Sequence, residues 1–313
     1  NSNIFFRDQN KEIISISKMK KFEYFFDFQN KSKKLNILGN LFGSNFKFNW
    51  TKDFSNPYIT SGNINFKNPN LNILNEFNKE NQDFIKAETK ISFLINKLDL
   101  IYKFNQDGIE LIDDKSNKIN HSKLIGKIKL DPFFFDLNLI LSGIRIETLL
   151  NNLFLSLHKV NQSVNFNFNG NLKVNLNEIN NRLFENLVIN INFLEEKISL
   201  NESSLKLKKI GKINFSDPSI YQKNQKLFVK SKIKFDVENQ QELYKRFLIP
   251  RQNRIDLNKV FFEVEYNIDD GNYFLSSINF KESENNQVVF YEVNNIQQLN
   301  SLISSEFKKV TLD

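Results

Sequence analysis

Apolar and polar residues alternate along much of this chain. The alternation is clearest at 164–168, Val-Asn-Phe-Asn-Phe, and at 172–176, Leu-Lys-Val-Asn-Leu. Strict alternation of this kind is typical of a β-strand with one buried and one wetted face. Asn169-Gly170 lies between the two runs, and this dipeptide favours the positive φ angles of a tight turn. The pattern therefore predicts a hairpin across 164–176.

The same rule predicts two further hairpins and a series of single strands. The hairpins run from 98–104 through Asp107-Gly108 to 109–111, and from 260–268 through Asp270-Gly271 to 273–280. The other strands are expected at 22–28, 35–41, 46–50, 90–94, 137–141, 187–193, 197–200 and 227–237. Nearly all have a polar second face, which favours an antiparallel sheet, because strands of parallel sheets read as continuous apolar runs. The predicted class is mainly antiparallel β.

Three stretches change to helical spacing of apolar residues, at 146–157, 243–248 and 296–310. Asn239 followed three residues later by Glu242 is a typical helix start before the second stretch. We expect three short amphipathic helices that pack on the sheet or close its end.

A short motif recurs three times: glycine, an alternating strand, then an Asn-Pro or Asp-Pro step. The copies lie at Gly62–Pro69, Gly126–Pro132 and Gly211–Pro218, and the second and third are each followed, after further strand, by a predicted helix. Glycine permits a bend at the strand entry, and proline stops the strand because it cannot donate to a ladder. The motif predicts an array of repeated strand modules.

Strands with one apolar face must hide that face, and three arrangements remain open. The sheet can close on a second sheet as a sandwich, roll into a barrel, or curve into a trough whose inner face accepts apolar ligands. The alternation alone favours the sandwich. We expect two segments, 1–160 ending in a helix and 161–313 with two short helices, both part of one continuous sheet in a larger protein.

Composition and charge narrow the range of expected partners. Of the 313 residues, 40% are hydrophobic and 25% charged, which is typical of a folded protein. The net charge is +7, but the lysines are scattered along the strands, so we expect no nucleic-acid partner. No signal peptide or spanning run is visible, and Asn1 is no initiator, so we interpret the chain as an internal or C-terminal fragment whose membrane anchor lies elsewhere.

The residues offer no recognisable catalytic or cofactor site. There is no cysteine, and the two histidines, His121 and His158, have no partner at a metal-ligand spacing. The acidic pairs Asp113-Asp114, Glu195-Glu196 and Asp269-Asp270 fall where turns are expected, and no Gly-x-Ser-x-Gly elbow or phosphate-binding loop occurs. We therefore expect a protein that is not an enzyme and holds neither metal nor cofactor.

Three segments together resemble the AsmA-like family in its alphaproteobacterial form. They are 18–50, with its Lys-Phe-Glu-Tyr-Phe-Phe-Asp-Phe strand; 126–157, where Gly-Lys-Ile-Lys-Leu-Asp-Pro-Phe-Phe-Phe leads into a helix; and 211–280, with its Gly-Lys-Ile-Asn-Phe strand and Tyr-Lys-Arg-Phe helix. The resemblance covers most of the chain and consists of strand patterns without catalytic motifs.

This resemblance implies an envelope protein of the periplasm, anchored to the inner membrane, whose elongated, curved, groove-like sheet passes phospholipid between the two membranes and supports outer-membrane assembly. The expected partners are phospholipid or another acyl lipid, and the membrane itself. Candidate groove-lining residues are Phe166, Phe168, Val174, Ile189, Ile191, Val264, Tyr266 and Leu275. The alternative is a structural or adhesive β-sandwich protein with a closed core.

Overall fold

The computed structural model describes residues 2–281 with short gaps. The gaps fall at 9–10, 57–58, 68–69, 79–84, 94–95, 105–106, 114–121, 163–168, 178, 180–181, 195–196, 255–256 and 271. The predicted helix at 296–310 and the hairpin strand at 164–168 lie outside the described residues.

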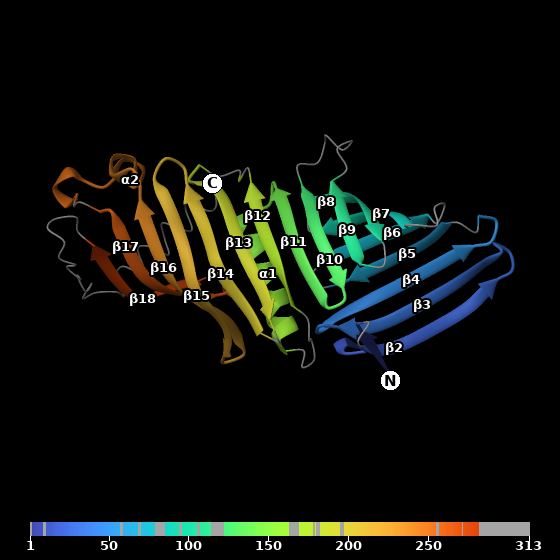
Figure 1. Cartoon of the computed structure of the whole chain (residues 1–313). Helices are drawn as coiled ribbons and strands as arrows, with labels where there is room; N and C mark the ends of the chain where they lie inside the picture. The colour runs from blue at the N-terminus through green and yellow to red at the C-terminus, as the bar shows by residue number, and fades with distance from the viewer. Residues whose placement is uncertain are drawn as a thin grey trace. The chain divides into compact units, whose positions relative to one another are not determined.

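The protein is mainly β, as predicted (Figure 1). The first eleven strands are β1 Ser2–Arg7, β2 Ile13–Asp27, β3 Ser32–Leu41, β4 Ser44–Asp53, β5 Ile59–Phe66, β6 Leu71–Asn78, β7 Ile85–Phe93, β8 Asn96–Phe104, β9 Gly108–Asp113, β10 Lys123–Leu130 and β11 Phe133–Ser142. The others are β12 Asn169–Asn177, β13 Phe184–Leu194, β14 Lys197–Leu207, β15 Gly211–Lys223, β16 Lys226–Val237, β17 Lys259–Asn267 and β18 Asn272–Lys281.

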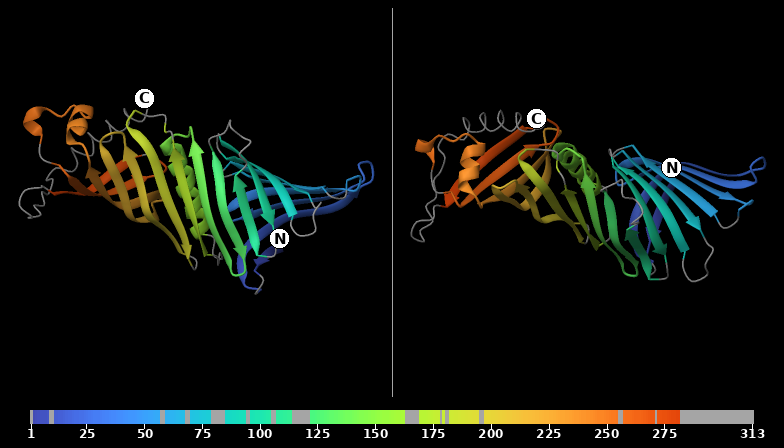
Figure 2. Two further views of the ribbon diagram at one scale, coloured as in Figure 1. Left: turned by 45° about the horizontal axis from the view of Figure 1, so that its top comes forward. Right: turned by 90° about the horizontal axis from the view of Figure 1, so that it is seen from above.

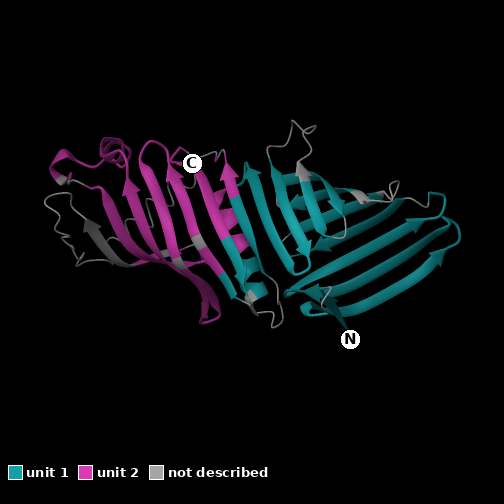
Figure 3. Cartoon of the chain, in the orientation of Figure 1, with its two compact units in different colours: residues 1–144, 155–174, 191–198 teal, residues 145–154, 175–190, 199–313 magenta. Residues whose placement is uncertain are grey.

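The chain divides into two compact units (Figure 3). Unit 1 comprises residues 1–144, 155–174 and 191–198, and unit 2 comprises residues 145–154, 175–190 and 199–313. Strands β12, β13 and β14 each contribute residues to both units. The predicted boundary between 160 and 161 stays a prediction.

The strands β1 to β11 of unit 1 form an antiparallel meander. Each strand pairs with the one before and the one after it in the chain, from β1·β2 through to β10·β11. Figure 2 shows the same succession from two further directions. Such pairing needs only short turns between strands, which agrees with the turn signals of the sequence.

Two of the three predicted hairpins are confirmed, and one is wrong. Strands β8 and β9 pair across the turn before Gly108, and β17 pairs with β18. Asn169 and Gly170, however, lie inside β12 and make no turn. A Cβ at Gly170 would lie 2.5 Å from Phe135 Cδ1, so this glycine lets a ring of β11, the adjacent strand, lie against the backbone. Close approach is the other common reason for glycine within a strand.

The repeated motif is confirmed only in part. Gly211 begins β15 as predicted, but Gly62 and Gly126 lie inside β5 and β10 and not at the strand entry. At Gly126 a Cβ would lie 2.0 Å from the Asp136 carbonyl oxygen, and φ is +144°, so only glycine fits there. The second copy ends as predicted, because β10 stops at Leu130, before Asp131 and Pro132. In the third copy Pro218 lies within β15, where the register with β16 shifts between Ser216 and Ser219. A bulge leaves a residue unpaired, so the missing N–H of proline costs no ladder bond.

Two of the predicted helices are present. Helix α1 spans Ile146–Gln162 and helix α2 spans Gln240–Arg246. As the sequence indicates, the side chain of Asn239 caps α2 by accepting a hydrogen bond from the Glu242 backbone N–H. A 3₁₀ turn, η1, follows at Arg251–Asn253. None of the described helices combines the length and apolar content of a membrane span.

In unit 2, β14 to β18 form a second antiparallel meander with a buried apolar side. One cluster joins Leu227, Val229, Tyr266 and Ile268, and Phe154 of α1 packs against it. A second cluster is centred on Val260 and Leu275. The first part of α1 therefore covers part of the sheet of unit 2.

Candidate functional site

The principal feature of unit 1 is a series of apolar rows that cross its strands. Residues directly paired across antiparallel strands share one face of the sheet. The central row is Phe22, Ile37, Phe48, Ile64, Ile73, Ile91 and Leu98, one residue from each of β2 to β8. The flanking rows are Met19, Gly39, Phe46, Phe66, Leu71, Phe93, Asn96 and Tyr24, Leu35, Trp50, Gly62, Asn75, Thr89, Leu100. We call these three rows the apolar face of unit 1.

Exposure along the apolar face falls from β2 to β8. Phe22 and Tyr24 are each 54% exposed, whereas Leu98 and Leu100 are buried. The central-row residues between them, such as Ile64, are half-buried. Large side chains of a closed core are normally inaccessible. The β2 end of this face is thus open to solvent.

The opposite face of the same strands is polar. One of its rows is Glu23, Asn36, Asn49, Asn63, Leu74, Lys90 and Asp99. We call this side the polar face of unit 1. Glu23 and Lys90 are exposed and the other polar side chains of this row are half-buried, which is typical of the wetted face of an antiparallel sheet. One oxygen of the row, Asn63 Oδ1, is buried without a hydrogen-bond partner among the described residues.

A small polar cluster interrupts the apolar face. Thr89 Oγ1 and Tyr102 Oη donate hydrogen bonds to Asn75 Oδ1 at 2.6 and 3.1 Å. Burial raises the pKa of Tyr102, and the hydrogen bonds to Asn75 and Thr89 act in the opposite direction. The cluster contains hydroxyl and amide groups but no carboxylate or imidazole base, so it can orient a polar group but has no internal base to activate a nucleophile.

The sequence-predicted lining residues are dispersed. Phe166 and Phe168 lie outside the described residues. Val174 and Ile191 are buried in unit 1, and Ile189 is buried in unit 2. The remaining candidates, Val264, Tyr266 and Leu275, lie together on the apolar side of β17 and β18 in unit 2. The structure thus brings the last group together on one side of unit 2.

Tyr266 fixes α1 to the sheet of unit 2. Its hydroxyl donates a hydrogen bond to Asn151 Oδ1 at 2.7 Å. Burial, followed by the nearby charge of Glu147, raises the pKa of Tyr266. Leu275 is only 9% exposed, and Val264 is partly buried against the same cluster. These three side chains therefore serve as core residues in this structure.

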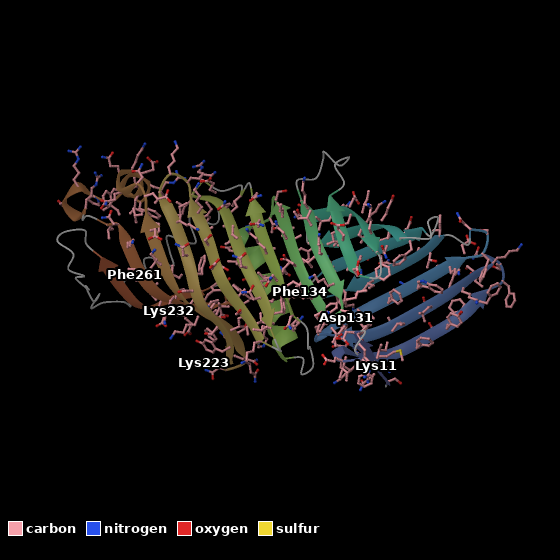
Figure 4. The ribbon with its side chains drawn as sticks, in the orientation of Figure 1. Lys11, Asp131, Phe134, Lys223, Lys232 and Phe261 are labelled. Atoms are coloured by element: carbon pink, nitrogen blue, oxygen red, sulfur yellow. The ribbon has the colours of Figure 1, made fainter. Side chains whose placement is uncertain are left out.

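The polar side of unit 2 carries charges and exposed rings. Lys232 of β16 and Phe261 of β17 project from this side (Figure 4). The ring of Tyr221 stacks on Phe228, with the centroids 5.6 Å apart. Burial first, and then the hydrogen bond and charge of Glu265, raise the pKa of Tyr221 to about 12. The phenol therefore stays neutral at physiological pH.

Among the acidic and histidine candidates, the structure shows the surroundings of Asp269, Asp270 and His158. Asp269 Oδ2 accepts a hydrogen bond from the Leu227 backbone N–H at 2.7 Å, and Asp270 pairs with Lys226. Both carboxylates thus organise the β17–β18 turn. Burial lowers the pKa of His158, which lies on α1. Across the described ranges, no group of three His, Asp or Glu side chains is arranged to hold a metal ion.

Comparisons with known proteins identify no relative of this chain. No family model, curated protein or solved structure matches this chain. The site must therefore be interpreted from its own geometry.

Sequence reasoning missed the β2–β8 part of the site. The alternation predicts most of these strands but not β6, and all eight predicted lining residues lie after residue 160. The signal was present in the alternation of Phe22, Tyr24 and Phe26, and again in Phe46, Phe48 and Trp50. Pairing these alternations into continuous rows requires the register of the strands, which the sequence does not state.

Proposed function

We propose that the protein is a non-catalytic envelope protein of the periplasm whose apolar face binds the acyl chains of phospholipid. In this proposal, phospholipid passes along the face between the inner and outer membranes and supports outer-membrane assembly. The observation that carries the proposal is the central row of unit 1, in which seven consecutive strands each contribute one apolar side chain while the β2 end stays open to solvent.

The energetics of such a face suit passage as well as binding. Each methylene transferred from water to an apolar contact contributes ~0.8 kcal/mol. Neighbouring strands are about 4.8 Å apart, and each presents a similar side chain, so a lipid can leave one contact as it makes the next. Movement then needs no chemical step. The polar cluster around Asn75 lies in the flanking row, where it offers hydrogen-bonding groups beside the apolar path.

The proposal includes a curved, groove-like form of the sheet. One approach within unit 1 supports curvature: Lys159, near the end of α1, lies with its Cβ 3.3 Å from the position of a Cβ at Gly43. Gly43 belongs to the β3–β4 turn, whereas α1 follows β11 in the chain. A helix that begins after β11 and reaches the β3–β4 turn is compatible with a sheet that bends.

A structural or adhesive protein with a closed core is the second candidate. Unit 2 favours it, because Leu227, Val229 and Tyr266 are buried and Phe154 of α1 covers them. A face already covered by its own helix has less room for a ligand. The two candidates differ in whether apolar molecules bind the folded protein.

The test is binding of a fluorescent fatty acid to the purified protein. We expect saturable binding by the wild type, and about tenfold weaker binding by Ile73→Asp, because a carboxylate on the apolar face opposes contact with an acyl chain. Leu74→Asp is the matched control, since Leu74 is the next residue in β6 and points to the polar face. It should bind the fatty acid as the wild type does.

Circular dichroism spectra of both variants check that they are folded. Absence of fatty-acid binding by the wild type would favour the closed-core candidate. Equal losses in folded Ile73→Asp and Leu74→Asp would show that the apolar face is not the binding surface.

A further inference from the structure

One edge of the apolar face of unit 1 carries a cluster of phenylalanine and lysine side chains. Phe26 lies at the end of β2, Phe28 follows that strand, and Phe54 follows β4. Lys33 and Lys52 lie in β3 and β4 beside them. We call these five residues the rim.

The rim rings touch one another but remain in water. The centroid of Phe26 is 4.9 Å from that of Phe28 and 5.8 Å from that of Phe54. Phe28 is nevertheless 84% exposed, and the other two rings are also exposed. Single exposed apolar residues are ordinary, but a contiguous cluster of them marks an interaction surface.

The charge of the rim has one sign on the apolar side. Lys33 is paired directly with Phe26 on one neighbouring strand and with Lys52 on the other, so all three side chains share the apolar face. Like charges placed directly opposite each other destabilise a sheet. The Lys33 ammonium lies 5.4 Å from the centre of the Phe54 ring, a contact that does not neutralise it.

The nearby carboxylates face the other way. Asp27 and Asp53 are both paired with Ser32, in the next row, which points to the polar face. Asp27 is engaged there by Lys34 at 2.6 Å. The apolar side of the rim thus combines three exposed phenyl rings with two ammonium groups and none of the acids of this hairpin end.

We propose that the rim docks on the surface of an anionic lipid bilayer. The phenyl rings enter the boundary between headgroups and acyl chains, and the two ammonium groups lie at the level of the lipid phosphates. Lysine stems are suited to this position because their methylenes contact the apolar layer while the charge stays in water. Opposed lysines lose their mutual repulsion when anionic headgroups lie between them.

The composition favours a bilayer over a protein partner. Phenylalanine is common at interfaces between proteins as well, but lysine is depleted there, and the binding hot spots of such interfaces are enriched in tryptophan, tyrosine and arginine. The rim has phenylalanine and lysine. Docking is independent of the acyl-chain binding proposed above, although it would bring a bilayer to the open end of the apolar face.

The experiment is cosedimentation of the chain with lipid vesicles. We expect binding to vesicles of equal phosphatidylglycerol and phosphatidylcholine, and at least about tenfold weaker binding to phosphatidylcholine alone, because anionic lipids attract basic side chains. The variant Phe28→Ser/Phe54→Ser should bind the anionic vesicles about tenfold less. Lys33→Gln/Lys52→Gln should lose about fivefold per lysine and most of its salt sensitivity.

Matched controls come from unit 2. Phe274→Ser removes a phenyl ring that is 46% exposed, close to the 44% of Phe54, and Lys223→Gln removes an exposed lysine. Both should bind vesicles as the wild type does. Circular dichroism spectra and thermal melts check that the rim variants are folded.

Three results would overturn docking: equal binding to both vesicle types, unchanged vesicle binding by the rim variants, or sedimentation equilibrium showing that the rim instead joins two copies of the chain. The proposed function fails separately. A wild type that binds anionic vesicles through the rim but binds no fatty acid would retain docking and exclude the acyl-chain proposal.

Discussion

At the scale of the residue, the ion pair of Asp27 shows how a surface carboxylate is held in the β2–β3 hairpin. Lys34 Nζ donates to Asp27 Oδ2 at 2.6 Å, and Asn30 donates both a side-chain and a backbone hydrogen bond to the same carboxylate. The hydrogen bond from Lys34, followed by those from Asn30, holds the pKa of Asp27 well below its usual range. The charged form is therefore the one that the folded hairpin stabilises.

The lowered pKa of Asp27 makes the stability of the fold depend on pH in a defined direction. Because the pKa is lower in the folded state than in the unfolded state, the carboxylate stabilises the fold fully above about pH 4, and this contribution is lost as the pH falls toward the folded-state pKa. Asp27→Asn should therefore melt at a lower temperature than the wild type at neutral pH, and the difference should shrink in acid. Thermal melts followed by circular dichroism measure it.

Glu238→Gln is the control for Asp27→Asn, because it removes the same formal charge from an exposed residue before α2. Its melting temperature should stay near that of the wild type at both pH values. A difference between Asp27→Asn and the wild type that persists unchanged in strong acid would show that the carboxylate's charge does not stabilise the hairpin.

Residue chemistry also explains what the sequence could reveal about the site. Alternation assigns each side chain to one of two faces, so the apolar character of Phe46, Phe48 and Trp50 was predictable. It does not say whether that face is covered. Val264, Tyr266 and Leu275 have the same alternation, yet they are core residues, because neighbouring side chains and, at Tyr266, helix α1 cover them.

At the scale of the element, most strands and two helices were predictable because their signals are local. The helix start at Asn239 needs only its own side chain and the Glu242 backbone N–H, which lie within one turn. The turn predicted at Asn169 and Gly170 was wrong because the reason for Gly170 is tertiary. The ring that excludes a side chain there comes from Phe135, on another strand.

Two glycines allow a direct test of tertiary close approach. Both Gly126 and Gly143 have positive φ, but a Cβ at Gly126 would meet the Asp136 carbonyl oxygen, whereas a Cβ at Gly143 would meet no atom within 4 Å. Gly143→Ala should cost about 1–2 kcal/mol of unfolding free energy from backbone conformation alone. Gly126→Ala should cost clearly more, because β10 and β11 must also separate.

Urea unfolding of the two variants measures the difference. Gly143→Ala is itself the control for backbone strain without a steric clash. Equal losses of stability in the two variants would show that the β10–β11 pair can relax around a methyl group and that the repeated glycine is not required for close approach.

At the scale of the whole molecule, sequential strand pairing limits how far a local loss of stability spreads. In each meander a strand pairs with the strands before and after it, and the chain forms two compact units. Arrays held by nearest-neighbour contacts open in local segments when one contact is weakened. We therefore expect the effects of core substitutions to stay within the unit that contains them.

Ile233→Ala tests this expectation in unit 2. Ile233 is buried in β16 between Phe215 of β15 and Phe262 of β17. Its truncation to alanine should lower the free energy of unfolding by about 2–5 kcal/mol. In hydrogen–deuterium exchange, the amides of β15 to β17 should lose protection, while those of β3 to β6 keep it. Ile64→Ala, in β5, should give the converse pattern. Uniform loss of protection in both units would show that they unfold together.

Sequential pairing also has a consequence for inheritance. Duplicating the coding segment of one hairpin adds two strands, which widens a meander by about 10 Å and leaves every later side chain on its original side. Inserting one codon within a strand instead reverses the orientation of the residues beyond it, unless a bulge like the one between Ser216 and Ser219 absorbs the extra residue. A lineage could thus lengthen this surface in whole hairpins without redesigning the existing part.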